Sequence, residues 1–357
     1  MDPKAAAEGN SESAVDREKG AEGAMGAKGG LGAGGRIFGL PTVMVACLCY
    51  CASSSSMVLA NKFVLSSFDF HCPNTIILAQ CLSCLILVKA CEGLGYIRLE
   101  PLKYELMAMW APANVVFVCM LLSGFFALKH LNVAMVTVLK NCTNLLVITG
   151  DYFFYGRTYS SKVWVSLLLM IASAIAGGAT DLEFNALGYV WQLINCCFTA
   201  GYSLVLRGVM DRVSAHTRSG GKLDEFSMVL YNNLLSVPLL LLVIVFFGEA
   251  AQLPHQGALH EPTFLLAVLA TGVLGFAISF ASLWFLSTAT PTIYSLTGSL
   301  NKIPLAALGI FLFNVQTSAA NLVSIAIGLS AGIVFVQALQ ASKAKQQASA
   351  SNKVSRV

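Results

Sequence analysis

Ten long apolar segments restrict the fold of this 357-residue chain more than any other feature. A helix needs about 20 apolar residues to cross the hydrocarbon core of a bilayer. Windows of that length run over 37–60, 73–91, 105–128, 131–151, 163–180, 186–207, 225–247, 263–286, 290–313 and 319–340. Charged residues make up only 11% of the chain, against roughly 25% in soluble domains. The sequence therefore predicts an all-α membrane protein with ten transmembrane helices.

The placement of Lys and Arg predicts the orientation of these helices. With a cytosolic N-terminus, eighteen of the 22 Lys and Arg fall in cytosolic tails and loops, and only Lys62 and Lys129 fall on the opposite side. The remaining two, Lys140 and Lys302, lie inside apolar segments. Because positive residues accumulate on the cytosolic side of membrane proteins, both termini are expected in the cytosol.

The ten segments divide into two sets of five, a first transmembrane repeat over 37–180 and a second over 186–340. Five is odd, so the second repeat is expected to be inverted relative to the first. Inverted repeats recur in transporters, which hold their substrates near the bilayer midplane between the repeats. The fourth segment of each repeat carries an adjacent lysine and asparagine, which supports a pseudosymmetric core.

Two polar stretches flank the repeats. Residues 1–36 are rich in Gly, Ala, Ser and mixed charge and lack the apolar run of a signal peptide, so a disordered cytosolic tail is expected. Residues 341–357 are expected to form a second cytosolic tail. The six acidic residues within 1–36 also argue against a plastid transit peptide, which is poor in acids.

Lys302 predicts a binding site for an anion. A charge at mid-bilayer costs roughly 2.5–3.5 kcal/mol on insertion scales, so it should face a cavity or a partner. Nearby, Gly298 allows close approach to the backbone, Asn301 can donate to phosphate or sugar hydroxyls, and Pro304 loosens the helix. Tyr294 lies one to two turns earlier. The alternative is a lysine that snorkels or pairs with a carboxylate, but the segments contain few carboxylates.

A second polar group, Tyr231-Asn232-Asn233, interrupts the seventh segment. Adjacent amides in an apolar helix cost several kcal/mol unless they are hydrogen bonded. An amide offers one acceptor and two donors, which suits the edge of guanine, and Tyr231 could stack on the purine or bond the ribose. Ser279 and Ser282 share a helix face and could border the same pocket. Interhelical hydrogen bonds and helix packing are equally open explanations for these residues.

Lys140 and Asn141 form a third polar group. Three roles are open for it: a gate, a structural pair, or a second charge that contacts a ligand. Small-residue faces such as Ala172–Gly178 are candidates for helix packing or for a homodimer. The sequence contains no HExxH, Walker A or GxSxG motif, and its five histidines are scattered. We therefore expect no enzymatic activity, no cofactor, no metal and no nucleic-acid partner, with the lipid bilayer as the surroundings.

Two motifs are similar to those of a known family. The stretch TYSLTGSLNKIPLA resembles the GxLNK motif of Golgi GDP-mannose transporters, and LYNNLLS resembles their FYNN motif, with Leu230 in place of the phenylalanine. The resemblance covers about residues 38–340 and is to the plant branch of Golgi GDP-sugar transporters. It implies the drug/metabolite transporter fold and a Golgi antiporter that exchanges cytosolic GDP-mannose, or another GDP-sugar, for lumenal GMP.

The resemblance also implies roles for individual residues. Guanine and ribose would be recognised by Tyr231, Asn232 and Asn233, with Ser279 and Ser282 beside the base. Sugar and phosphates would be held by Tyr294, Gly298, Asn301 and Lys302. Two other functions stay open: a plastid sugar-phosphate translocator of the same superfamily, and a non-transporting membrane receptor or scaffold.

Overall fold

A computed structural model of the chain describes residues 36–37, 40–156, 158–213, 216–217, 223–289 and 291–354. They divide into a small unit that ends at Val45 and a second unit, Ala46–Val357. In the small unit, β1 (Arg36–Ile37) pairs with β2 (Leu40–Pro41) in antiparallel fashion. Nearly all of the expected N-terminal tail, residues 1–35, lies outside the described residues.

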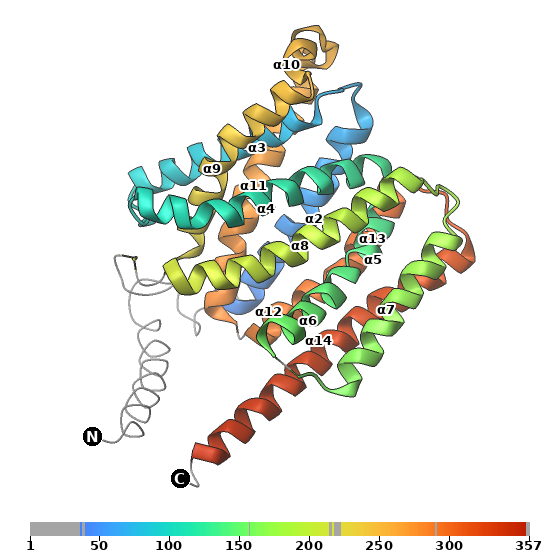
Figure 1. Cartoon of the computed structure of the whole chain (residues 1–357). Helices are drawn as coiled ribbons and strands as arrows, with labels where there is room; N and C mark the ends of the chain where they lie inside the picture. Colours follow the sequence, from blue (N-terminus) through green and yellow to red (C-terminus); the bar gives the residue numbers. More distant parts are fainter. Residues whose placement is uncertain are drawn as a thin grey trace. The chain divides into compact units, whose positions relative to one another are not determined.

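The regular elements among the described residues of the second unit are all helical (Figure 1). It begins within α2 (Thr42–Ser67), whose first turn belongs to the small unit. The elements that follow are α3 (Pro73–Gly93), α4 (Tyr104–His130), α5 (Val133–Leu139), α6 (Cys142–Tyr155), α7 (Ser161–Ala179), α8 (Ala186–Val213), α9 (Glu225–Phe246), α10 (Glu249–Gln252), the 3-10 turns η1 (Leu253–His255) and η2 (Gly257–His260), α11 (Pro262–Thr288), α12 (Pro291–Leu300), α13 (Lys302–Leu312) and α14 (Ala319–Val354).

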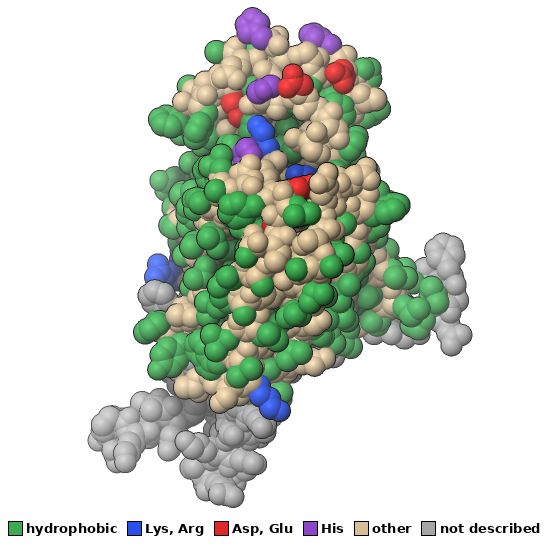
Figure 2. All heavy atoms as spheres, turned by 90° about the vertical axis from the view of Figure 1, so that its right-hand side faces the viewer, with side chains coloured by type: hydrophobic (Ala, Val, Ile, Leu, Met, Phe, Trp, Pro, Cys, Tyr) green, Lys and Arg blue, Asp and Glu red, His purple; other side chains and the backbone are tan. Residues whose placement is uncertain are grey.

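Within the described residues, nine helical stretches are long and apolar enough to cross a membrane. Figure 2 shows the matching surface, where hydrophobic side chains cover the middle of one face and charged side chains gather toward its ends. The chain is therefore a multi-pass membrane protein, as the composition predicts. The expected ninth segment, 290–313, is not a single helix, because α12 ends at Leu300 and α13 begins at Lys302.

Three expected helix ends are wrong. The first helix begins at Thr42, rather than at 37, because Arg36–Ile37 pairs with Leu40–Pro41 as β1 and β2. It continues to Ser67, beyond residue 60, because the polar side chains of Asn61 and Lys62 both find protein partners. At the other end, α14 continues past residue 340 to Val354 through a stretch rich in Ala, Lys and Gln, which are strong helix formers.

The lysine-asparagine pairs mark the two interrupted helices. Between α5 and α6, the amide of Asn141 donates to the carbonyl of Val138, a shorter-range bond than the α-helical one, and the helix restarts at Cys142. Between α12 and α13, Pro304 has no amide hydrogen to donate to the carbonyl one turn before it. Interrupted helices of this kind line the binding sites of many transporters.

Helices that are distant in sequence pack side by side. α4 lies along α8, α7 along α14, and α3 against both α9 and α11, as Figure 1 also shows. The α5 and α13 halves of the interrupted helices pack together, with Val133 against the bare backbone of Gly309. At the end of α4, the ammonium of Lys62 donates to the carbonyls of Leu128 (2.9 Å) and Leu131 (2.7 Å). A cation is favourable at a helix C-terminus, so this lysine is structural.

A buried carboxylate ties α10 to the start of α3. Glu249 is only 4% exposed and accepts four hydrogen bonds. They come from the amide and the side chain of Asn74 (3.1 and 2.7 Å) and from the amide and the hydroxyl of Thr75 (both 3.0 Å). The carboxylate thus satisfies the free amides at a helix N-terminus, where negative charge is also favourable.

Glu249→Ala should lower the free energy of unfolding by about 3 kcal/mol, because it leaves buried donors of α3 without an acceptor. Thermal unfolding of the purified protein in detergent measures the loss. Glu261→Ala is the matched control, because Glu261 is exposed and makes no capping hydrogen bond with its side chain. Equal midpoints for the two variants would show that Glu249 does not hold α10 on α3.

Candidate functional site

Lys302 lies at the point where the two interrupted helices meet. Its Nζ donates to Oδ1 of Asn141 at 2.7 Å, and Nδ2 of Asn141 donates to the carbonyl of Gly328 in α14 at 3.2 Å. Lys140 directly precedes Asn141, the acceptor of Lys302, so both lysines lie at the same helix break. An ammonium has three donors, so Lys302 keeps two after its bond to Asn141. The structure therefore brings together two lysines that the sequence places 162 residues apart.

No carboxylate balances these two charges in the part of the chain that the structure describes. The ion pairs found there are His71–Asp69, Lys89–Glu92 and Lys103–Glu100, each between residues close in sequence. Lys140 also keeps accessible surface, although both of its neighbours in sequence are buried. Two unneutralised cations in an apolar surrounding make a strong site for a multivalent anion.

Asn301 and Gly298 face the side of α2. Oδ1 of Asn301 accepts from the hydroxyl of Ser55 at 3.1 Å, and its Nδ2 approaches the carbonyl of Cys51 at 3.4 Å. A Cβ added at Gly298 would lie 3.3 Å from the hydroxyl of Tyr50, so the glycine lets α12 approach that tyrosine. Asn301 and Gly298, two of the residues predicted to hold phosphate and sugar, thus pack against α2.

An aromatic cluster adjoins this wall. The ring of Tyr294 lies 5.1 Å from that of Tyr50 and 5.7 Å from that of Phe285, and Tyr50 and Phe285 also stack at 5.7 Å. Tyr50 is not among the site residues predicted from the sequence. A signal for it existed, because Cys47, Cys51 and Ser55 recur at four-residue intervals and so mark one polar face of α2 beside this tyrosine.

The two amides of the seventh segment have different surroundings. Oδ1 of Asn232 accepts from the indole of Trp110 at 2.8 Å, and its Nδ2 donates to the hydroxyl of Tyr202 at 2.8 Å. Asn233 donates to the carbonyl of Val229 within its own helix. No partner of Oδ1 of Asn233 is found among the described residues. Asn232 is therefore held by the protein, whereas Asn233 keeps an acceptor and a donor for a ligand.

Tyr231 is buried beside this amide pair. Its side chain is 1% exposed, its ring lies 6.3 Å from that of Trp110, and its hydroxyl donates to the carbonyl of Pro101 at 2.9 Å. In this conformation Tyr231 holds α9 against Pro101, which lies just before α4. Its predicted contact with ribose or base stays a prediction.

Asn232, Asn233 and Ser279 line one cavity of about 290 Å³ between α9 and α11. Gln80 of α3 and Met57 of α2 also line it, and Nε2 of Gln80 donates to Asn61 and to Thr271, both at 2.9 Å. Three of the five residues predicted for the base and ribose are thus brought together. Ser282 is half-buried one turn further along α11 and is not part of this lining.

The cavity and the lysine group are joined by two helices. α2 contributes Met57 to the cavity and Tyr50 to the aromatic cluster, and α11 contributes Ser279 and Phe285 in the same way. Phe285 lies six positions after Ser279 in the helix, which is about 9 Å along the axis. An extended ligand with an aromatic base at one end and phosphates at the other fits this arrangement better than a compact anion.

Asn232→Ala should lower the free energy of unfolding by about 2 kcal/mol, because it leaves the buried indole N–H of Trp110 without its acceptor and the hydroxyl of Tyr202 without its donor. Asn233→Ala should change it by less than about 0.5 kcal/mol, because only a bond within the helix is lost. Thermal unfolding without added ligand measures both. An unchanged unfolding midpoint for Asn232→Ala would show that the protein does not hold this amide.

Comparison with known proteins places this geometry in a family. A model described as the Triose-phosphate Transporter family matches residues 42–336. The GDP-mannose transporter GONST1 of Arabidopsis thaliana is 51% identical over 291 residues, which cover 82% of this chain and 87% of the relative. GONST2, a GDP-mannose transporter of the same plant, is 46% identical over 83% of this chain and 78% of its own length.

Matches at lower sequence identity also cover most of this chain. A GDP-mannose transporter of Aspergillus niger is 28% identical over 84% of this chain and 80% of its own length. A solved protein structure shares the fold with a TM-score of 0.51 at 16% identity, over 84% of this chain and 97% of that one. The resemblance seen in the sequence motifs is confirmed by relatives that span most of the chain. The chain therefore belongs to the Triose-phosphate Transporter family.

Proposed function

We propose that this protein carries GDP-mannose, or a related GDP-sugar, across the Golgi membrane in exchange for GMP. The observation that carries the proposal is the pairing of two sites on shared helices: unneutralised lysines at the helix breaks and an amide-lined cavity between α9 and α11. The relatives of highest identity given above are named GDP-mannose transporters, which favours transport over catalysis and guanine over other bases.

The lysines bind the diphosphate in this proposal. Lys302 has two donors beyond its bond to Asn141, and Lys140 supplies a second charge from the other helix break. A pyrophosphate brings at least two negative charges, so it neutralises both ammonium groups. Asn301, with Ser55 beside it, and Tyr294 then face the sugar, and Gly298 leaves room for it against Tyr50.

The cavity takes the base. Asn233 offers the acceptor and donor that match the guanine edge, with Ser279 from the facing helix. Asn232 acts by holding the helix through Trp110 and Tyr202, and Tyr231 does so through Pro101. Ser282 extends the serine face of α11 toward the ribose.

Two inverted five-helix repeats, 37–180 and 186–340, account for the interrupted helices. Counting each interrupted pair as one span gives ten spans, with one break in the fourth and one in the ninth. Breaks at corresponding places in two halves are typical of inverted-repeat transporters. The distribution of Lys and Arg supports a cytosolic position for both termini, including the tail 341–357.

Exchange follows from the charges. A carrier that returns without ligand must move two cations that have only a neutral amide beside them, and an unpaired charge in a membrane interior is costly. Returning with GMP neutralises them. Transport in one direction is therefore tied to transport in the other.

Lys302→Ala should reduce GDP-mannose uptake into GMP-loaded proteoliposomes at least about a hundredfold, because a charge-assisted contact to phosphate is worth roughly 3 kcal/mol. Lys302→Arg should keep part of the activity. Lys89→Ala is the control, since Lys89 is exposed and pairs with Glu92 on the surface. Near-normal exchange by Lys302→Ala would remove the lysine pair from the mechanism.

The family description favours a second candidate, a transporter of triose phosphate or a similar sugar phosphate. Such a ligand needs the lysines but has no base for the amide cavity. Thermal shifts in detergent separate the candidates, because a bound ligand stabilises the folded protein. GMP and GDP-mannose should raise the unfolding midpoint, whereas UDP-galactose and triose phosphate should not. In the Asn233→Ala variant, the shifts caused by guanine and uracil ligands should become more similar. Stabilisation by triose phosphate alone would favour the second candidate, and no stabilisation by any ligand would favour a scaffold.

A further inference from the structure

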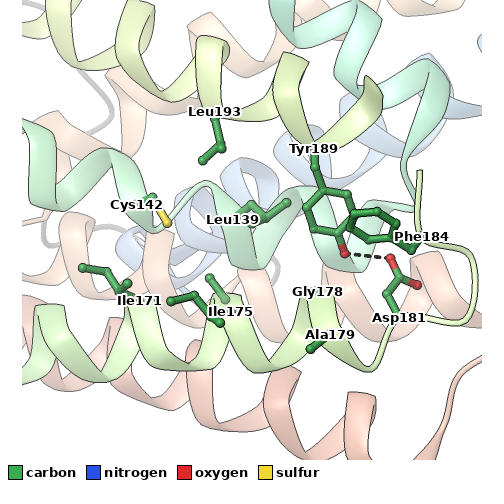
Figure 3. A pocket seen from close by; sticks show the side chains of 11 residues that line it. Leu139, Cys142, Ile171, Ile175, Gly178, Ala179, Asp181, Phe184, Tyr189 and Leu193 are labelled. Carbon is green, nitrogen blue, oxygen red and sulfur yellow. Dashed lines mark hydrogen bonds between the residues drawn. The ribbon is translucent and has the colours of Figure 1, made fainter. Parts of the chain in front are cut away.

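A second and larger cavity, of about 630 Å³, lies between α7 and α8 (Figure 3). Its sides are apolar, and it does not share lining residues with the amide cavity. The main lining residues are Ile171, Ala174, Ile175 and Gly178 of α7, Leu193 of α8, and Leu139 at the end of α5. Leu139 directly precedes Lys140, so the cavity lies against the α5–α6 break.

The cavity opens to the surroundings of the helices. Ile175 is 68% exposed and Leu193 is 50% exposed, and both belong to helices that are long and apolar enough to span a membrane. Apolar surface on such helices faces lipid, and an apolar cavity gives water no hydrogen-bond partners. The space is therefore accessible to molecules from the bilayer.

One end of the cavity is polar. Asp181 follows the end of α7, and its Oδ2 accepts from the hydroxyl of Tyr189 at 2.7 Å (Figure 3). Its Oδ1 accepts from the amide of Glu183 at 3.1 Å. The ring of Phe184 lies 4.7 Å from that of Tyr189 and closes this end with a flat aromatic wall. The cavity thus combines an apolar body with a polar end beyond the helix terminus, the arrangement of an amphiphile in a bilayer leaflet.

The polar end selects the kind of head group. A carboxylate has lone pairs left after two hydrogen bonds, whereas the hydroxyl hydrogen of Tyr189 is already used. The end therefore offers acceptors and a negative charge, which favours a head group that donates and disfavours a phosphate. A volume of 630 Å³ also falls within the range that encloses a compact small molecule.

We propose that this cavity binds a sterol. The sterol hydroxyl donates to the carboxylate of Asp181, and its ring system lies along α7 between Ile171 and Gly178, with Leu193 as the opposite wall. The bare backbone at Gly178 is needed for this shape, because a Cβ there would lie 3.2 Å from the ring of Tyr189.

The test is photolabelling of the full-length protein in phosphatidylcholine vesicles with a diazirine-bearing cholesterol analogue. Labelled peptides should map to α7 and α8, and unlabelled cholesterol should compete. Leu193→Trp fills the cavity from α8 and should reduce labelling to background. Leu168→Trp is the matched control, because Leu168 is 64% exposed on α7 and does not line the cavity. Thermal unfolding shows that both variants fold.

A second arm tests the head group. Cholest-4-en-3-one carries a ketone in place of the hydroxyl, so it cannot donate to Asp181. It should compete about tenfold less well than cholesterol, the order expected for losing one hydrogen bond to a charged acceptor. Equal competition would overturn the role of Asp181.

Two results would overturn the site as a whole. One is labelling that Leu193→Trp and Leu168→Trp leave equally unchanged. The other is an absence of labelling together with a disulfide-linked dimer of a Leu193→Cys variant, which would show that a second copy of the chain covers this face.

Discussion

A polar group inside a membrane must be satisfied by the protein itself, and this constraint organises the structure. The chain meets it in two ways. Lys62 donates to two carbonyls at the end of α4, so the fold holds its side chain in place. Lys302 has one neutral amide and a second lysine beside it, so its charge is not balanced. The difference between these two environments separates a structural lysine from one that is available to a ligand.

The helix breaks and the lysines belong together for the same reason. Each break sits at a lysine-asparagine pair, and Asn141 links all the parts: it accepts from Lys302 across the interface and donates to α14. A displacement of one interrupted helix therefore changes the surroundings of both charges. The cavity between α7 and α8 touches the α5–α6 break through Leu139 and Cys142, so its occupant would lie against this break.

Helix α2 contacts both the α12–α13 break and the amide-lined cavity. It presents Tyr50, Cys51 and Ser55 to the α12–α13 break and Met57 to the amide cavity, and Asn61 supports Gln80 within that cavity. These contacts join residues about 20 to 250 positions apart. A small-residue stripe on α2 signals such a face, but nothing in its own sequence says which helix it meets.

The sequence by itself determined the class of the protein and most of its helices. Apolar length is a local property, so nine spans could be read directly, and an unpaired lysine beside glycine and asparagine identified Lys302 as unusual. Only the tertiary structure decided which polar groups are free. Adjacent asparagines look alike in sequence, yet Trp110 and Tyr202 from other helices engage Asn232 and leave Asn233 open. The first helix boundary and the contact between Lys302 and Asn141 also depend on partners distant in sequence, because a hydrogen bond is made in space rather than along the chain.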